Sequence, residues 1–250
     1  MSSITSPAPV DRAGEPGEGW RAAWARVAFR IELAATVGSL ALTLAALSCF
    51  LAWVETRPDV VVLADPLLAA IPPRDFSMVT FGLIYGWIVL GLGTLATSPR
   101  RLLRALQAYV LLLLLRIVLM WLVPLEAPAG MVPLRDPVVE SFGPARMLVR
   151  DLFFSGHAST LFLLALAARG RALRLLLLVA TVLVAVLLVW QHVHYAVDVI
   201  VGPFVAKAAY DAAGALSSAR AWRVSGCTMR EQGESPRSST KRSTTAVHER

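Results

Sequence analysis

The sequence has little charge and little cysteine for its length. Each shortage limits the classes of protein to which the chain can belong. Charged residues make up 16% of the 250 residues, whereas hydrophobic residues make up 56%. A soluble domain would carry more charge, so the composition predicts a membrane protein. Cys49 lies in a long apolar run and Cys227 in a polar tail. This separation argues against a disulfide framework.

A secretory signal peptide is also missing, because residues 1–19 are polar and lack a short apolar core. We therefore expect the first long apolar run to stay in the protein as a membrane anchor. Most of the apolar runs approach the roughly 20 residues that a helix needs to cross about 30 Å of hydrocarbon. The runs are 31–53, 78–97, 105–123, 153–168, 173–190 and 196–216. The predicted fold is all-α, a polytopic bundle of six transmembrane helices.

The predicted organisation has three parts: a cytoplasmic N-terminal segment (1–30), a transmembrane unit (31–216) and a C-terminal tail (217–250). Trp20, Trp24 and Ile31 recur at helical spacing, which fits an interfacial helix or simply the cytoplasmic start of the first span. Residues 217–250 are rich in Ser, Thr, Arg and Glu and poor in apolar residues. Such a segment cannot bury a core, so we expect a disordered basic tail.

The positions of the arginines predict the orientation. A net charge of +7 is compatible with nucleic-acid binding, but the basic residues are spread between apolar runs, so we expect no nucleic-acid partner. Arginine clusters lie before the first run, between the second and third, between the fourth and fifth, and after the sixth. The positive-inside rule then places both termini in the cytoplasm and the connections 55–76, 124–152 and 191–195 outside.

Two polar motifs interrupt the apolar pattern at the same predicted membrane face. The fourth run opens with "SGH" and the fifth ends in "WQHVHYAVDV". Because a short basic turn joins these runs, they are antiparallel, and His157, His192, His194 and Asp198 reach the outer face together. Ionisable residues in a membrane are costly unless they face one another or a cavity, so this cluster is a candidate functional site.

The residue types in this cluster suit phosphate chemistry. Ser155 can cap the fourth helix, and the free N–H groups of a helix start bind phosphate well. Gly156 would let a phosphate approach the backbone closely. His157 and His194 can carry protons near neutral pH, and an imidazole can attack phosphorus. Asp198 lies four residues after His194, where it can orient the ring and stabilise its charged form.

Two other interpretations stay open. Each of these residues taken alone has a structural explanation, such as an interfacial histidine or a helix-capping aspartate. Neutral imidazoles and a carboxylate also suit zinc, so His157, His192, His194 and Asp198 could form a metal site.

The two motifs resemble those of the sphingomyelin synthase branch of the phosphatidic acid phosphatase type 2 (PAP2) superfamily. "DLFFSGHASTLF" is similar to the Asp-x-aromatic-aromatic-Ser-Gly-His motif of that branch, and "HVHYAVDVIV" is similar to its His-x-His-Tyr-x-x-Asp-Val motif. Weaker similarity at 71–78, 115–128 and 133–137 extends the resemblance over about residues 65–210. The resemblance implies a six-helix fold and transfer of lipid headgroup phosphate without a metal or an organic cofactor.

The sequence departs from the wider superfamily pattern at its phosphate-binding cations. Phe154 stands where classical members have proline before "SGH", Leu187 and Leu188 stand at the Ser-Arg positions, and lysine occurs only at positions 207 and 241. These departures favour the synthase branch. They leave open which cationic residues form the phosphate clamp, that is, bind the substrate phosphate.

We favour Arg116 for the clamp, because an arginine inside an apolar run usually faces a partner or a cavity, although its side chain is long enough to snorkel to the interface. Asp151 and Glu126 would tune the histidines or bind a headgroup, or pair with nearby arginines. His192 and Tyr195 belong to the second motif and complete the expected substrate-binding residues. The other candidates for the clamp are Arg74, Arg135, Arg146 and Arg150.

By resemblance, His157, His194 and Asp198 form the catalytic triad of a lipid phosphotransferase. His194 attacks the phosphorus of a membrane phospholipid, Asp198 orients His194, and His157 protonates the leaving diacylglycerol. A lipid alcohol such as ceramide then accepts the phosphate. The alternatives are a hydrolase that uses water as the acceptor and, less favoured, a transporter or metal-binding protein. Richness in Ala, Leu and Arg suggests a bacterial plasma membrane, with the site on its exoplasmic side.

Overall fold

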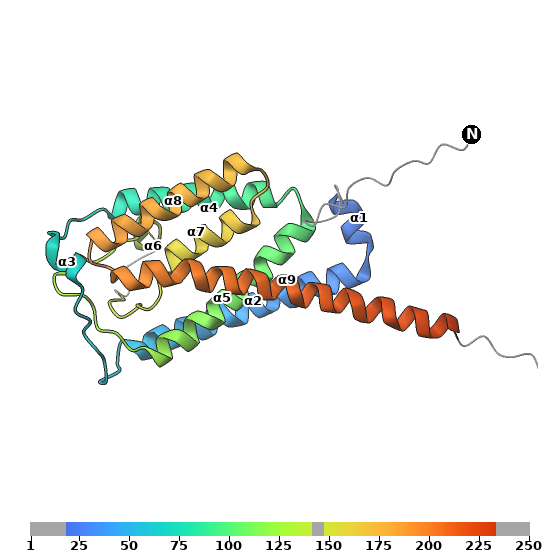
Figure 1. Cartoon of the computed structure of the whole chain (residues 1–250), viewed down its shortest axis with the longest axis horizontal. Helices are drawn as coiled ribbons and strands as arrows, with labels where there is room; N and C mark the ends of the chain where they lie inside the picture. Colours follow the sequence, from blue (N-terminus) through green and yellow to red (C-terminus); the bar gives the residue numbers. More distant parts are fainter. Residues whose placement is uncertain (1–18, 142–147, 234–250) are drawn as a thin grey trace, which may run out of the picture. The chain divides into compact units, whose positions relative to one another are not determined.

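The computed structural model describes residues 19–141 and 148–233, and within these ranges the regular structure is helical. An isolated β-bridge joins Val61 and Leu125, and this part of the chain contains no strand. The helices are α1 (Trp20–Ala25), α2 (Val27–Val54), α3 (Pro66–Ala70), α4 (Ser77–Leu95), α5 (Pro99–Leu122), α6 (Pro137–Ser141), α7 (Gly156–Ala167), α8 (Arg171–Trp190) and α9 (Ala196–Gly233) (Figure 1).

Five of these helices are long and apolar enough to cross a membrane: α2, α4, α5, α8 and the Ala196–Ser217 part of α9. The prediction of an all-helical, multi-pass membrane protein is therefore confirmed. The fourth predicted span is α7, whose 12 residues extend only about 18 Å along the axis. Its Ser-Gly start and the following arginines limit its length, so a sixth crossing at this place stays a prediction.

The predicted interfacial helix before the first span is divided in two. The chain is helical over Trp20–Ala25, turns to an extended conformation at Arg26 and resumes as α2 at Val27. The Trp20 indole donates a 2.6 Å hydrogen bond from Nε1 to the carbonyl oxygen of Ala96, which attaches α1 to the end of α4. The depth of α1 in a membrane remains a prediction.

The chain divides into two compact units, 1–214 and 215–250. Helix α9 continues into the second unit as far as Gly233, through part of the segment where the sequence predicts disorder. No proline interrupts the chain between Leu216 and Pro236, which is compatible with a continuous helix. The disorder of 217–250 stays a prediction. Residues 234–250 lie outside the described residues.

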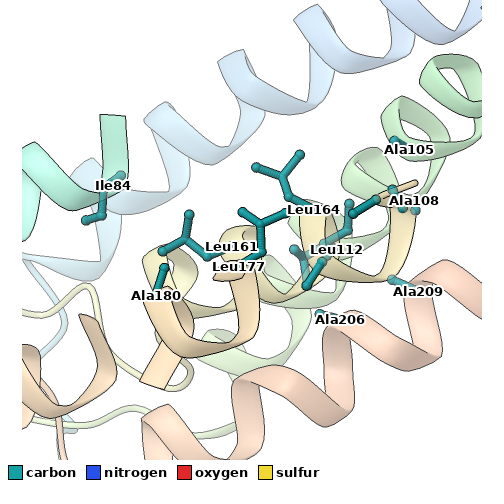
Figure 2. Close-up of a cluster of buried hydrophobic side chains, with 14 of the residues drawn as sticks. Ile84, Ala105, Ala108, Leu112, Leu161, Leu164, Leu177, Ala180, Ala206 and Ala209 are labelled. Atoms are coloured by element: carbon teal, nitrogen blue, oxygen red, sulfur yellow. The ribbon is translucent and has the colours of Figure 1, made fainter. Parts of the chain in front are cut away.

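Helix α7 is at the centre of the hydrophobic core of residues 19–214. Figure 2 shows Leu161 and Leu164 of α7 close to Leu177 of α8 and Leu112 of α5. The helices around α7 contribute several small side chains to this core as well as large ones, and small residues let helix backbones approach closely. These small residues are Ala105 and Ala108 of α5, Ala180 of α8, and Ala206 and Ala209 of α9 (Figure 2).

Gly202 of α9 packs closely against the start of α7. A Cβ atom at this position would collide with Ser159 Oγ and would lie 3.3 Å from the carbonyl oxygen of Ser155. Ser159 cannot easily move, because its hydroxyl donates a 2.6 Å hydrogen bond to that same carbonyl oxygen. The packing of α9 against the start of α7 therefore requires glycine.

We predict that Gly202→Ala destabilises the detergent-purified protein by about 1–3 kcal/mol, the usual cost of overpacking a core. Gly82→Ala on α4 is the matched control, because a Cβ there meets no atom within 4 Å. An added methyl group at that site should be neutral or stabilising by up to about 1 kcal/mol. Thermal unfolding of both variants checks the prediction, and equal melting temperatures would contradict it.

Candidate active site

The starts of α7 and α9 are joined directly through their backbones. Ser155 caps α7, and its buried hydroxyl accepts a hydrogen bond from the Ala158 N–H at 3.5 Å. The Ser155 N–H donates to the carbonyl oxygen of Asp198 in the first turn of α9, at 3.2 Å. This connection brings the "SGH" motif and the second motif together, as the sequence predicts.

His194 and Asp198 form a buried hydrogen-bonded pair. His194 Nδ1 lies 3.2 Å from Asp198 Oδ2, and the side chains are 3% and 0% exposed. The backbone N–H of Tyr195 donates to the same carboxylate oxygen at 3.2 Å. With its proton on Nδ1 and donated to Asp198, His194 carries the lone pair on Nε2. That is the arrangement of an oriented nucleophile or general base.

His157 lies in the first turn of α7 on the wall of a cavity of about 300 Å³. Its ring stands edge-on to Phe81, with centroids 5.8 Å apart. Within the described residues, His157 Nδ1 and Asp198 Oδ1 are buried without a hydrogen-bond partner. Such atoms are rare in folded proteins. Thr80 Oγ1 and Arg104 Nε share this property, and of the four residues His157 lines the cavity, where a polar group of a ligand could complete its hydrogen bonding.

The cavity combines a polar end with long apolar walls. Gly156, His157, Arg116 and Asp151 line one part of it. The phenol of Tyr85, also at the wall, donates a 2.6 Å hydrogen bond to Asp136 Oδ2. The apolar walls come from α2, α4 and α5, and they include Leu47, Ile84, Ile88, Leu112 and Leu113.

Arg116 lies at the polar end and holds the start of α7 in place. Its buried guanidinium donates to the carbonyl oxygen of Phe154 at 2.6 Å and to Asp151 Oδ1 at 2.7 Å. A Cβ at position 156 would lie 2.5 Å from Arg116 Nη1, so glycine makes room for the guanidinium. The sequence predicts room for a phosphate at Gly156, whereas the structure places the cation itself against that backbone.

The pKa of Asp151 depends on its burial and on the positive charges near it. Burial raises the pKa of its carboxyl, but attraction by Arg116, followed by that of His194 and His157, is stronger and leaves the pKa below its usual value. Both histidines therefore act on one carboxylate at the mouth of α7. His157, His194 and Arg116 thus all lie near Asp151, and Asp198 is joined to this group through its hydrogen bond with His194.

Glu126 and Arg150 lie in a separate ion pair that fastens the outer connections. The Arg150 guanidinium donates to Glu126 Oε2 at 2.7 Å and to Oε1 at 3.2 Å. It also donates to the carbonyl oxygens of Glu55 and Arg57 at the end of α2. The described contacts thus give both residues a structural use, and neither lines the cavity.

His192 and Tyr195 attach other segments to the turn between α8 and α9. The two ring nitrogens of His192 lie 3.1 Å from the carbonyl oxygens of Ala129 and Ile71. The Tyr195 hydroxyl donates to the carbonyl oxygen of Glu126 at 3.0 Å. Both ring nitrogens of His192 are therefore engaged by backbone carbonyl groups. The described residues contain no group of three or more His, Cys, Asp or Glu side chains arranged for a metal.

The remaining arginine candidates lie outside the cavity or beyond the described chain. Arg74 and Arg135 are exposed and are not among the residues that line the cavity. Arg146 lies outside the described residues. Of the four predicted clamp residues within the described ranges, Arg116 is the one that lines the cavity with His157.

Sequence reasoning did not single out two polar residues that organise the site. Buried Gln191 accepts a hydrogen bond from the Phe76 N–H and donates to Ser77 Oγ, joining the start of α4 to the end of α8. Asp65 caps α3 and also contacts the start of α9. The Asp-Pro pair at 65–66 is a helix-start signal that indicates the first of these roles.

We predict that the Glu126–Arg150 pair makes stability depend on acidic pH. The hydrogen bond from Arg150, against the opposing effect of burial, lowers the pKa of Glu126 from its usual 4.5. The unfolded chain takes up this proton first, so the stabilisation is complete above about pH 4.5 and is lost as pH falls through the lower folded pKa.

The test compares melting temperatures of the wild type and Glu126→Gln in detergent. The variant should be less stable by about 1 kcal/mol near neutral pH, and this difference should shrink as pH falls below about 4.5. Asp59→Asn, at an exposed carboxylate of the same connection, is the control. A stability difference that persists unchanged at acidic pH would contradict the assignment.

Comparison with known proteins gives one family match. No significant match was found among curated proteins. The matched segment starts at Arg150, contains α7 and α8, and ends in α9 at Ala213, so it includes both histidine motifs. Residues 150–213 match the family model described as PAP2 superfamily C-terminal.

Proposed function

We propose that the protein is an integral-membrane lipid phosphotransferase of the sphingomyelin synthase type. The observation that carries this proposal is the buried His194–Asp198 pair, in which Nδ1 is engaged by the carboxylate and Nε2 is left for reaction. The PAP2 superfamily C-terminal match at 150–213 supports it, because it is compatible with a lipid phosphatase or phosphotransferase. In this proposal residues 31–216 form the catalytic unit, and the site faces the exoplasmic side of a bacterial plasma membrane, with both termini in the cytoplasm.

The first step forms a bond between His194 Nε2 and the phosphorus of a phospholipid. The phosphorus–oxygen bond to diacylglycerol breaks, and protonated His157 gives its proton to the departing oxygen. Asp198 stabilises the positive charge that develops on the His194 ring. The product of this step is diacylglycerol, with the headgroup phosphate held on His194.

The second step releases the phosphate from the enzyme. A lipid alcohol such as ceramide gives its proton to His157, and its oxygen attacks the phosphorus. The phosphorus–nitrogen bond breaks, and His194 regains its lone pair. The cycle returns both histidines to their starting states, so the chain's own residues account for every proton.

Arg116 and the start of α7 supply the positive potential for the phosphate. The guanidinium lies against Gly156, and the first N–H groups of a helix attract an anion. Its contact with Asp151 fixes the guanidinium, as a preorganised donor requires. This arrangement takes the place of the lysine and arginine motifs that classical members of the superfamily carry.

The apolar walls of the cavity suit lipid substrates and bear on the choice of acceptor. Transfer to a lipid alcohol requires that water stays away from the phosphorylated histidine after diacylglycerol leaves. A hydrolase would use the same triad, with water as the acceptor. The geometry of the triad is the same for both acceptors, so an assay of the products identifies the acceptor.

We predict that His157→Ala and His194→Ala each lower turnover by at least about 10²-fold, with the larger loss for the nucleophile His194. The assay uses purified protein, fluorescent ceramide, a panel of phospholipid donors, and EDTA. His248→Ala, at the fourth histidine of the sequence, is the control and should keep wild-type turnover. Near-normal turnover by His194→Ala would refute the mechanism.

The products of the same assay separate the alternatives. Fluorescent headgroup–ceramide that forms in EDTA and disappears in His194→Ala supports the synthase. Water-soluble phosphate or phosphorylated headgroup without a lipid product indicates the hydrolase.

A separate metal analysis tests the metal-site alternative. Stoichiometric zinc in the purified protein that is lost in His192→Ala would favour it.

We further predict that Gly156→Ala lowers turnover by about tenfold or more, because the added methyl group displaces the Arg116 guanidinium from the phosphate position. Gly86→Ala on α4 is the matched control, since a Cβ there meets nothing within 4 Å. The two variants are compared in the fluorescent ceramide assay. Equal turnover would show that the contact between Gly156 and Arg116 is unimportant for the reaction.

A further inference from the structure

Asp65 contacts two helix starts that are far apart in the sequence. Its Oδ1 accepts hydrogen bonds from the N–H groups of Leu67, at 2.9 Å, and Leu68, at 3.4 Å, which caps α3. Its Oδ2 accepts a 2.7 Å hydrogen bond from the N–H of Ala196, the first residue of α9. Figure 1 shows α3 at the end of the helices where α9 begins.

Helix α9 needs this contact because its own preceding residue cannot cap it. The first N–H groups of a helix have no partner inside the helix and usually bond to the side chain just before it. That residue is Tyr195, whose hydroxyl instead accepts from the Leu63 N–H and donates to the carbonyl oxygen of Glu126. Asp65 therefore supplies the cap for α9 from another part of the chain.

Asp65 is held firmly enough to act as a fixed support. The segment before it is attached to the connection after α5, where the Val61 N–H donates to the carbonyl oxygen of Pro124 at 2.9 Å. The Glu126 N–H donates back to the carbonyl oxygen of Val61 at 3.0 Å. Together with the hydrogen bond from the Leu63 N–H to the Tyr195 hydroxyl, these contacts fix the chain just before Asp65, and α3 begins directly after it.

The capped residue lies beside the proposed catalytic pair. Ala196 is two positions after His194 and two positions before Asp198. The Asp198 carboxylate also accepts from the Tyr195 N–H, so the backbone of this first turn sets the position of the carboxylate relative to the imidazole. A shift of the Ala196 N–H would change the His194–Asp198 geometry.

We propose that Asp65 is a positioning residue for the reaction: by capping α9 at Ala196, it holds Asp198 in line with His194. This inference rests on the proposed function, because it assigns Asp65 to the reaction of the same site. Asp65 does not touch the reacting atoms and acts through Asp198.

Asp65→Asn separates the two caps. The amide oxygen of asparagine can still cap α3, whereas its NH₂ group would face the Ala196 N–H, and two donors cannot bond to each other. A hydrogen bond to a charged group is typically worth enough to slow amide exchange about tenfold. Hydrogen–deuterium exchange in peptides that cover residues 194–200 should therefore be about tenfold faster in Asp65→Asn than in the wild type or in Asp59→Asn.

A double-mutant cycle with Asp198→Asn distinguishes positioning from general stabilisation. In the fluorescent ceramide assay, Asp65→Asn should lower turnover about tenfold in the wild-type background and less than about twofold in the Asp198→Asn background, because residues that act through one another are not additive. Asp59→Asn, with an exposed carboxylate on the same segment, should stay within about twofold of the wild type in both backgrounds.

The possible results distinguish a failure of this proposal from a failure of the proposed function. Equal losses in both backgrounds, or unchanged exchange at 194–200, would overturn the role of Asp65 and leave the triad standing. Wild-type turnover in Asp198→Asn would overturn the triad itself. The exchange measurement needs no substrate, so it tests the cap even if the donor lipids chosen are not turned over.

Discussion

The structure depends on the burial of one carboxylate, that of Asp198, inside an apolar protein. A buried charge is expensive unless hydrogen bonds and an opposite charge compensate for it. His194 and the Tyr195 N–H approach Asp198 Oδ2, the Ser155 N–H bonds to its backbone carbonyl oxygen, and Asp65 caps the helix on which it lies. Three segments of the chain therefore meet at the start of α9, and the proposed reaction centre is also a structural junction.

The outer connections are organised by polar side chains that serve structure rather than chemistry. Arg150, Gln191 and His192 each bond to the backbone of connections that are distant in the sequence. Their hydrogen-bonding groups are engaged, whereas His157 Nδ1 and Asp198 Oδ1 have no partner among the described residues. Of these two residues, His157 lines the cavity, whereas Asp198 is fully buried and contacts His194.

Hydrophobic runs predicted the five long helices, because the length needed to cross a bilayer is a strong constraint on the sequence. The antiparallel arrangement of the fourth and fifth runs correctly brought the two histidine motifs together, since a short turn leaves no other geometry. The favoured clamp residue, Arg116, lines the cavity, and its phosphate role stays a prediction. Its packing against Gly156 depends on the rotations of α5 and α7, which periodicity does not determine. The pairing of Glu126 with Arg150 and the contact of Asp65 with Ala196 join loops across 24 and 131 positions. No local pattern encodes such contacts.

The central claim is that the headgroup phosphate is carried on His194 between two lipids. The most direct measurement is to incubate the purified protein with a phospholipid labelled in its headgroup phosphate, stop the reaction in alkali, where a phosphorus–nitrogen bond survives, and locate the label by mass spectrometry of peptides. We predict label on His194, lost on addition of a lipid alcohol and absent from His194→Ala. Label on another residue, or turnover by a protein that never carries the label, would contradict the account.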